Sequence, residues 1–332
     1  MSGLKSRIHS ERPMKIILAQ PRGFCAGVER AIEIVERALE VHGAPIYVRH
    51  EIVHNKYVVN ALKQKGSIFV NEIDEVPDGS VLIFSAHGVP KKVAEKAASR
   101  DLVIYDATCP LVRKVHAEVS KMHKAGYEII MIGHVGHPEV EGTVGQVDQH
   151  VEVVESAEQV ENLQLKNPEK VAYVSQTTIS CDDSKVVINA LKRKYPKVLE
   201  PKKADICYAT QNRQDAVKEL AKRSDLILVV GSKTSSNSNR LREVAEGVGT
   251  KAYLLDDASE IDPGWLKGVE SIGITAGASA PEILVEEIIE RLKEFEPCEV
   301  IAMEGVEENV EFPLPKGLWK KDLEEAKSQN KV

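Results

Sequence analysis

Three cysteines are the residues of this 332-residue chain best suited to chemistry, because each stands at the same point of a repeated pattern. Cys25, Cys109 and Cys207 each follow a short strand-like run and precede a helix-like run. They are separated by 84 (109 − 25) and 98 (207 − 109) residues, too far apart for a small metal-binding finger, so three strand ends must converge in space. Converging thiolates bind a soft metal or an iron–sulfur cluster. The spacing therefore predicts a shared site with one coordination position left open.

The segments around these cysteines repeat as three units in which strand-like and helix-like runs alternate. The strand-like runs are continuously apolar, which is typical of parallel sheets covered by helices on both faces. We therefore expect an α/β fold of three pseudo-threefold-related units with mostly parallel sheets around a central iron–sulfur site. The expected units span residues 14–108, 109–206 and 207–298, and residues 299–332 form a C-terminal tail that can add one strand and then wraps the surface.

Polar side chains follow the second and fourth strands of every unit. In parallel sheets ligands bind where the carboxyl ends of strands meet loops and helix N-termini, so repeat symmetry points these side chains toward one enclosed site. Hydroxyls, amides and imidazoles can hold a phosphate without a lysine cluster. Glu139 is the best general-acid candidate among them. The loops contain His54, His87, His134, His137, Glu139, Gln176, Thr177, Thr178, Ser235, Ser236, Asn237 and Ser279.

Composition excludes several other classes of function. A hydrophobic content of 42% with 29% charged residues is that of a soluble globular protein, and no apolar run approaches the roughly 18 residues of a membrane span. A net charge of −7 disfavours nucleic acid as a partner. Five cysteines, an odd number, argue against a disulfide framework and indicate the reducing cytoplasm. Neither a Walker loop nor a G-x-G-x-x-G motif after a strand is present, and without the latter we expect no dinucleotide site.

Simpler interpretations apply to single residues. A lone free cysteine is commonly a small buried hydrophobic residue, and we assign that role to Cys181 and Cys298, which have no counterparts in the repeat. Serines and asparagines before a helix, as in SSNSN, are usually N-caps. A single histidine after a strand is more often a satisfied polar residue than a ligand. Three cysteines and several histidines in corresponding loops favour the functional interpretation.

Nine motifs follow one another along the chain: PRGFCAGVERAI, HEIVHNKYVV, FSAHGVP, DATCPLV, GHPEVEGT, SQTT, ICYATQNRQ, GSKTSSNSNRL and TAGASAPE. Together they resemble the 4-hydroxy-3-methylbut-2-enyl diphosphate reductase family, which performs the last step of the non-mevalonate pathway of isoprene biosynthesis. The resemblance begins at about Met14 and continues beyond the last motif. It implies an oxidoreductase of three α/β domains around a central cavity. It also implies a [4Fe–4S] cluster held by three cysteines, which match Cys25, Cys109 and Cys207.

The same resemblance implies roles for the loop residues. The family removes an allylic hydroxyl reductively, with two electrons and two protons, and forms isopentenyl and dimethylallyl diphosphates plus water. Glu139 matches the proton donor, and Thr177 matches the threonine near the substrate hydroxyl. An outside donor of the ferredoxin or flavodoxin type would supply the electrons. The substrate's diphosphate would be bound by His54, His87, His137, Ser235, Asn237 and Ser279, with Ser236 adjacent.

Two other classes of function remain open from the residues. The cysteines could brace three domains of a non-catalytic iron–sulfur or zinc protein, although a structural zinc normally takes four protein ligands. An iron–sulfur hydro-lyase acting on a small phosphorylated substrate is the other alternative, because an open iron also serves dehydration without electrons. An absorption spectrum separates a cluster from zinc, and a demand for electrons in turnover separates a reductase from a hydro-lyase.

Overall fold

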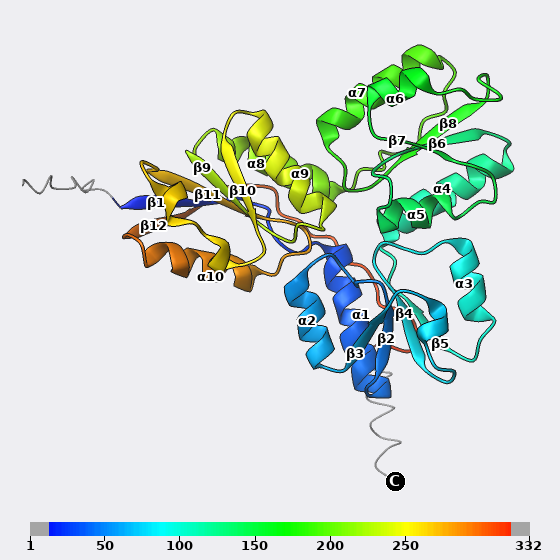
Figure 1. The fold of residues 1–332 in the computed structure, drawn as a ribbon, viewed down its shortest axis with the longest axis horizontal. Coiled ribbons are helices and arrows are strands. Elements are labelled where there is room, and N and C mark those ends of the chain that lie inside the picture. The colour runs from blue at the N-terminus through cyan, green and yellow to red at the C-terminus, as the bar shows by residue number, and fades with distance from the viewer. Residues whose placement is uncertain (1–12, 320–332) are drawn as a thin grey trace, which may run out of the picture.

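Three sheets covered by helices form three lobes that meet at a common centre, as Figure 1 shows. The structure is a computed structural model and describes residues 13–319. The first unit contains β2 (Ile46–Arg49), β3 (Ser67–Val70), β4 (Val81–Phe84), β5 (Val103–Asp106), α1 (Ala26–His42), α2 (Lys56–Gln64) and α3 (Lys91–Ala98). The second contains β6 (Glu128–Ile132), β7 (Glu152–Val154), β8 (Val171–Ser175), α4 (Pro110–Lys124), α5 (Pro138–Val144), α6 (Ala157–Asn162) and α7 (Cys181–Lys194). The third contains β9 (Leu226–Val230), β10 (Lys251–Leu255), β11 (Ser271–Ala276), β1 (Met14–Leu18), β12 (Cys298–Ala302), α8 (Tyr208–Ala221), α9 (Ser236–Gly247) and α10 (Glu282–Lys293).

The three units repeat one strand order. It reads β3-β2-β4 in the first unit, β7-β6-β8 in the second and β10-β9-β11 in the third. Every pairing between these strands is parallel within residues 13–319. This arrangement confirms the predicted α/β fold with three mostly parallel sheets.

Continuous apolar runs produce these sheets because both of their faces are covered. All five residues of β9 are buried, as expected for a central parallel strand. Helix α10 covers one face of the same sheet with a stripe of buried residues at helical spacing, which is the pattern of an amphipathic helix. That stripe consists of Leu284, Val285, Ile288, Ile289 and Leu292. Within the described residues, no helix has the length and apolar character needed to cross a bilayer.

Strand β1 lies in a different sheet from the one that its place in the sequence predicts. We expected residues 14–108 to form the first unit, yet β1 pairs with β11 and β12 of the third unit. The physical reason is a cyclic repeat, because β5, which leads to Cys109, also belongs to the sheet of the preceding unit. Thus β5, the strand before Cys109, completes the sheet of the first unit, and β1, the strand before Cys25, completes the sheet of the third unit. In this way β1 joins the N-terminal part of the chain to the third unit.

The segment before Cys207 also differs from the prediction. We expected a strand there, but residues 200–207 form no strand, and the only trace of one is an isolated parallel bridge between Ala172 and Leu199. This bridge lies beside β8, at the position that β5 and β1 occupy in the other sheets. The sequence PKKAD explains the loss, since proline and charged residues disfavour a buried strand.

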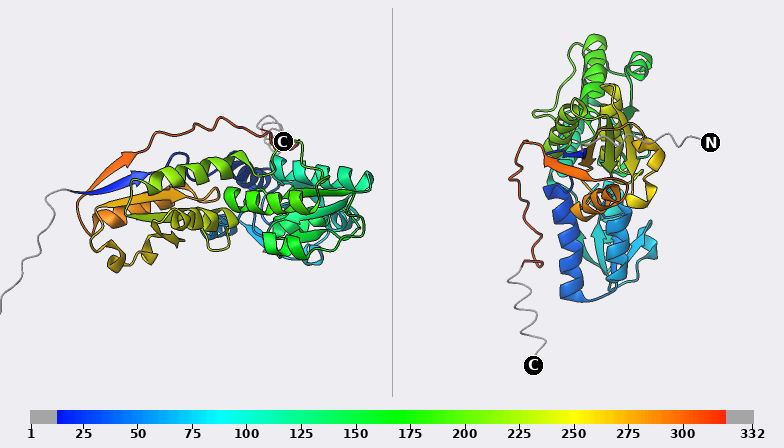
Figure 2. Two further views of the ribbon diagram at one scale, coloured as in Figure 1. Left: turned by 90° about the horizontal axis from the view of Figure 1, so that it is seen from above. Right: turned by 90° about the vertical axis from the view of Figure 1, so that its left-hand side faces the viewer.

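The tail adds one strand, β12, and then crosses the molecule as an extended segment, which we call the strap (residues 303–319). Figure 2 shows the strap in orange to red, running along the outside from β12 toward the first unit. Its far end is anchored by Leu314 and Leu318, which pack into the core of the first unit, with Leu318 fully buried. The strap thus connects the third unit to the first, and residues 320–332 of the predicted tail lie outside the described part.

Candidate active site

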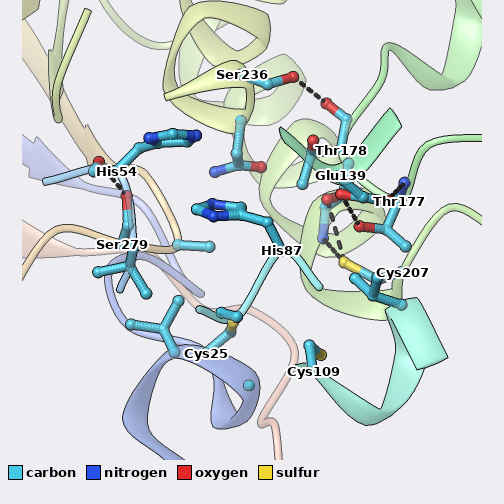
Figure 3. A pocket seen from close by; sticks show the side chains of 18 of the residues that line it. Cys25, His54, His87, Cys109, Glu139, Thr177, Thr178, Cys207, Ser236 and Ser279 are labelled. Carbon is cyan, nitrogen blue, oxygen red and sulfur yellow. Dashed lines mark hydrogen bonds between the residues drawn. The ribbon is translucent and has the colours of Figure 1, made fainter. Parts of the chain in front are cut away.

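One cavity lies where the three units meet, and all twelve residues to which the family resemblance assigns a role line it. Its volume is about 680 Å³, including the part open to solvent, which is in the usual range for a small-molecule site. Figure 3 shows Cys25 and Cys109 at one end of the cavity, with His54 and Ser236 toward the other. The twelve residues are Cys25, His54, His87, Cys109, His137, Glu139, Thr177, Cys207, Ser235, Ser236, Asn237 and Ser279.

Each of the three cysteines occupies the N-cap of a helix. Cys25 precedes α1, Cys109 precedes α4 and Cys207 precedes α8. Three helix N-termini are therefore directed at the sulfurs, and their unpaired N–H groups and positive dipole ends favour thiolate charge. The Cys207 sulfur also accepts a hydrogen bond from the backbone N–H of Thr210 at 3.3 Å and lies 3.2 Å from the Thr210 hydroxyl.

The cysteine end of the cavity fits a group that binds thiolates. Burial raises the pKa of Cys109 to about 12 and that of Cys207 to about 11, and it also raises the pKa of Cys25. A bound metal deprotonates such thiols. A Cβ at Gly27 would lie 2.7 Å from the Cys109 sulfur, so the wall is shaped closely around these atoms. No three His, Cys, Asp or Glu side chains of residues 13–319 lie close enough to hold a single ion, and the three sulfurs border the wider cavity instead.

Three imidazoles gather beyond the cysteines. The rings of His54 and His87 are stacked with centroids 4.2 Å apart, and His137 meets them edge-on at 5.4 and 5.8 Å. Burial and the neighbouring imidazoles lower the pKa of His137 to about 3 and hold that of His87 well below its ordinary value. An anionic ligand would oppose this shift, because negative charge favours the imidazolium. The cluster is therefore suited to accept negative charge.

Hydroxyl and amide groups from the third unit complete this wall. Ser235 caps α9, Ser236 donates to the Thr178 carbonyl at 3.1 Å, and Ser279 donates to the His54 carbonyl at 3.0 Å. The two side-chain polar atoms of Asn237 are buried and have no hydrogen-bond partner within the described chain. Buried polar groups are nearly always paired, so this amide is available to a ligand.

Glu139 and Thr177 form the acid–hydroxyl pair of the site. The Glu139 side chain is buried and accepts hydrogen bonds from the Thr177 backbone N–H at 2.6 Å and from its hydroxyl at 2.9 Å. Burial is the main cause that raises the Glu139 pKa to about 7, against the opposing effect of these bonds. A carboxyl group with that pKa can hold and release a proton near neutral pH.

The family profile described as "LytB protein" matches residues 16–293. The chain belongs to the LytB family. It is 64% identical over 304 residues to 4-hydroxy-3-methylbut-2-enyl diphosphate reductase 2 of Burkholderia mallei, covering 92% of this chain and 93% of that protein. It is also 62% identical over 307 residues to the reductase of the same name from Bordetella pertussis, covering 92% and 94%. The chain is thus an enzyme of the oxidoreductase class.

Two solved structures share the fold. One, the E-1-hydroxy-2-methyl-but-2-enyl-4-diphosphate reductase of Plasmodium falciparum, superposes with a TM-score of 0.87 at 37% identity and covers 97% of this chain and all of that one. The other is described as the terminal enzyme of the non-mevalonate pathway; it superposes with a TM-score of 0.61 at 34% identity, covering 85% and 99%.

Two loop residues of this LytB chain do not lie as expected. His134 was expected to point inward, but it lies 3.5 Å from Glu155 and lines a separate hollow beside α7. The reason is its position two residues after the end of β6, where Gln176 accepts a hydrogen bond from its backbone N–H at 3.0 Å. Gln176 itself is fully buried behind the cavity wall, where it also donates to Thr178. Cys181 and Cys298, to which we assigned structural roles, do not line the cavity, as expected.

Several residues of the cavity wall were not predicted from the sequence. Thr210 could have been found by its spacing, because the third position of a helix that starts at a cysteine faces that cysteine. The apolar lining carries no comparable signal, since such residues resemble ordinary core positions in sequence. It consists of Val28, Val53, Ala86, Leu111, Val112 and Ala278.

Proposed function

We propose that this chain is a 4-hydroxy-3-methylbut-2-enyl diphosphate reductase that forms isopentenyl and dimethylallyl diphosphates at a [4Fe–4S] cluster. Cys25, Cys109 and Cys207 would hold the cluster. The observation that carries the proposal is one cavity that joins three half-buried thiols to a wall of imidazoles, hydroxyls and an amide, with a buried acid on the same surface. The names of relatives at 62–64% identity support the same reaction.

The chemistry divides between the cofactor and the chain. The reaction breaks one C–O bond and consumes two electrons and two protons, and the oxygen leaves as water. When bound, a cluster held by these three cysteines would pass on the electrons from the outside donor and would offer a Lewis-acidic iron. The residues of the chain supply the protons, the orientation of the substrate and the exclusion of water.

Glu139 is the proton donor in this proposal. Its raised pKa keeps a substantial fraction protonated near neutral pH, and its carboxyl group lies against Thr177, whose hydroxyl reaches the cavity. Thr177 would orient the substrate's hydroxyl toward this acid. A positioned acid typically contributes about 10²–10⁴-fold in rate.

The diphosphate would occupy the wall formed by the imidazoles, serines and amide. His54, His87 and His137 come from the first two units, whereas Ser235, Ser236, Asn237 and Ser279 come from the third. The N-terminus of α9 adds backbone N–H groups, which favour a phosphate oxygen. Contacts to the diphosphate, away from the reacting carbon, would hold the substrate in the orientation that the reaction needs.

Electrons would come from an outside donor of the ferredoxin or flavodoxin type, because the sequence contains no nicotinamide fingerprint. We place the protein in the cytoplasm, where its five free cysteines would stay reduced.

Anaerobic turnover of the allylic diphosphate, with and without a chemical reductant, tests the reaction. We expect both five-carbon diphosphates to form only when the reductant is present, in an amount set by the electrons supplied. Consumption of the substrate without reductant would favour the iron–sulfur hydro-lyase instead.

A further inference from the structure

Three cationic side chains occupy equivalent places around the cysteines. Each lies on the helix that begins at one cysteine, on its second turn, and each is turned toward the loop before another cysteine. They follow their own cysteines by five, five and six residues, and they are Arg30 on α1, Lys114 on α4 and Arg213 on α8.

Arg30 contacts the loop that leads to the second cysteine. Its Nη1 atom donates to the carbonyls of Ala107 and Thr108, at 3.4 and 3.3 Å, and these two residues directly precede Cys109. The side chain is buried, so its hydrogen bonds are shielded from water.

Lys114 makes the equivalent contact with the loop that leads to the third cysteine, Cys207. Its ammonium donates to the carbonyls of Lys203 and Ala204 at 2.8 and 2.9 Å and lies 3.1 Å from the Asp205 carboxylate. These residues stand two to four positions before Cys207, in the segment that lacks a strand. The cation therefore holds a loop that no ladder of backbone hydrogen bonds fixes.

Arg213 closes the ring. Its Nε and Nη2 atoms donate to the Gly23 carbonyl at 3.0 and 2.8 Å, and Nη2 also donates to the Phe24 carbonyl at 3.1 Å, directly before Cys25. It is a fully buried arginine, and such a charge persists only with full hydrogen bonding and a partner.

The strap contacts two of the three cations. Both carboxylate oxygens of Glu308 lie 3.1 Å from Nη1 of Arg213, and the Pro313 carbonyl accepts from Nε of Arg30 at 2.8 Å. Beyond these contacts the strap is anchored by Leu318 in the first unit's core. The path of the strap thus keeps two arginines in place behind the cysteine loops.

We propose that Arg30, Lys114 and Arg213 form a ring of positioning residues that fixes the three cysteine loops for the iron–sulfur cluster and raises its reduction potential. The inference rests on the proposed function. Partners of metal ligands set the ligands' orientation, and charge near a cluster sets its potential. Positive charges stabilise the reduced, more negative cluster, so removal of one should shift the potential to more negative values.

Lys114 gives the sharpest test because it is the most exposed of the three. The Asp205 carboxylate that its loss leaves without a cation still accepts a hydrogen bond from the Ser175 backbone N–H at 2.9 Å. The variants are Lys114→Met and Lys114→Arg, with Lys121→Met as the control, an exposed lysine two turns further along α4. The rate of iron release to a chelator is measured for each anaerobically loaded protein. The midpoint potential is measured by redox titration on a separate sample without chelator. Lys114→Met should release iron roughly 10–100-fold faster and show a more negative potential, whereas the other two should match the wild type.

A second variant separates geometry from charge and covers a failure of Lys114→Met to fold. Arg30→Lys keeps the charge but cannot make all the forked contacts, so iron release should accelerate while the potential stays close to that of the wild type. If Lys114→Met and Arg30→Lys both released iron at the wild-type rate, the proposed ring of positioning residues would be wrong. A wild-type chain that takes up no iron would instead contradict the proposed cofactor, and the ring with it.

Discussion

At the scale of single residues, the pairing of Glu139 with Thr177 carries most of the acid chemistry. The carboxyl group is buried on the cavity wall and held by two hydrogen bonds from one neighbour, so its position is fixed while its pKa is raised to about 7. Fixed geometry combined with a pKa near the working pH is what a general acid requires.

Replacement of Glu139 with glutamine should slow turnover by about 10²–10⁴-fold while the protein keeps its cluster and its affinity for substrate. The amide preserves size and hydrogen bonding but cannot give up a proton as a carboxylic acid does. Single-turnover measurements on pre-reduced protein separate binding from bond cleavage. Glu141→Gln, an exposed change on the same helix, is the control, and near-normal cleavage in Glu139→Gln would remove Glu139 from the mechanism.

The raised pKa of Glu139 also fixes the sign of a pH effect on stability. The folded protein binds this proton more tightly than the unfolded chain does, so the stabilisation is complete below the ordinary pKa of 4.5 and is lost as the pH rises through about 7. The difference amounts to about 3 kcal/mol. As the pH rises from 5 to 8, the free energy of unfolding of Glu139→Gln should therefore increase relative to that of the wild type. Urea unfolding of the metal-free proteins measures both. A difference in the free energy of unfolding between the two proteins that stays the same at every pH would contradict the raised pKa of Glu139.

At the scale of elements, helix α1 contains Gly27 at a position where alanine would favour the helix. Alanine at Gly27 would suit the helix by up to about 1 kcal/mol, but its Cβ would lie 2.7 Å from the Cys109 sulfur. The sulfur can rotate away in the metal-free protein and cannot once it is a ligand. Gly27→Ala should therefore fold normally yet lose iron roughly tenfold faster to a chelator. Gly247→Ala, where nothing lies within 4 Å of the new Cβ, should behave as the wild type.

The strap is the second element with a testable role. Leu318 is fully buried in the core of the first unit, so Leu318→Ala should lower the free energy of unfolding by about 2–5 kcal/mol. Val310, on the exposed part of the strap, provides the control, because Val310→Ala should change it by less than about 0.5 kcal/mol. Urea denaturation followed by circular dichroism measures both, and equal values would mean that the strap does not support the first unit.

The sequence predicted the elements and the site to different degrees. Apolar runs and helical spacing predict β9 and α10 because local burial decides them. The sheet of β1 could not be predicted, because a five-residue strand carries no information about a partner more than 250 residues away. The cavity residues were predictable as polar groups at the ends of parallel strands, whereas the outward direction of His134 depends on a contact with Gln176.

At the scale of the whole molecule, the three units are joined in a cycle. Strand β1 connects the start of the chain to the third unit, and the strap returns from the third unit to the first. The cavity lies at the centre of this cycle and takes one cysteine from the start of α1, one from α4 and one from α8. A cluster bound there would tie together parts of the chain that are separate in sequence, so loss of any one ligand should release it.

Iron and acid-labile sulfide analysis of anaerobically purified protein tests this claim most directly. We expect the full complement of one [4Fe–4S] cluster per chain in the wild type and in Cys181→Ser, whose cysteine lies away from the cavity. Cys25→Ser, Cys109→Ser and Cys207→Ser should each be nearly devoid of both, because a hard oxygen ligand holds iron–sulfur clusters poorly. A full cluster in any of these three variants, or its loss in Cys181→Ser, would contradict the assignment of the cluster to the three cysteines.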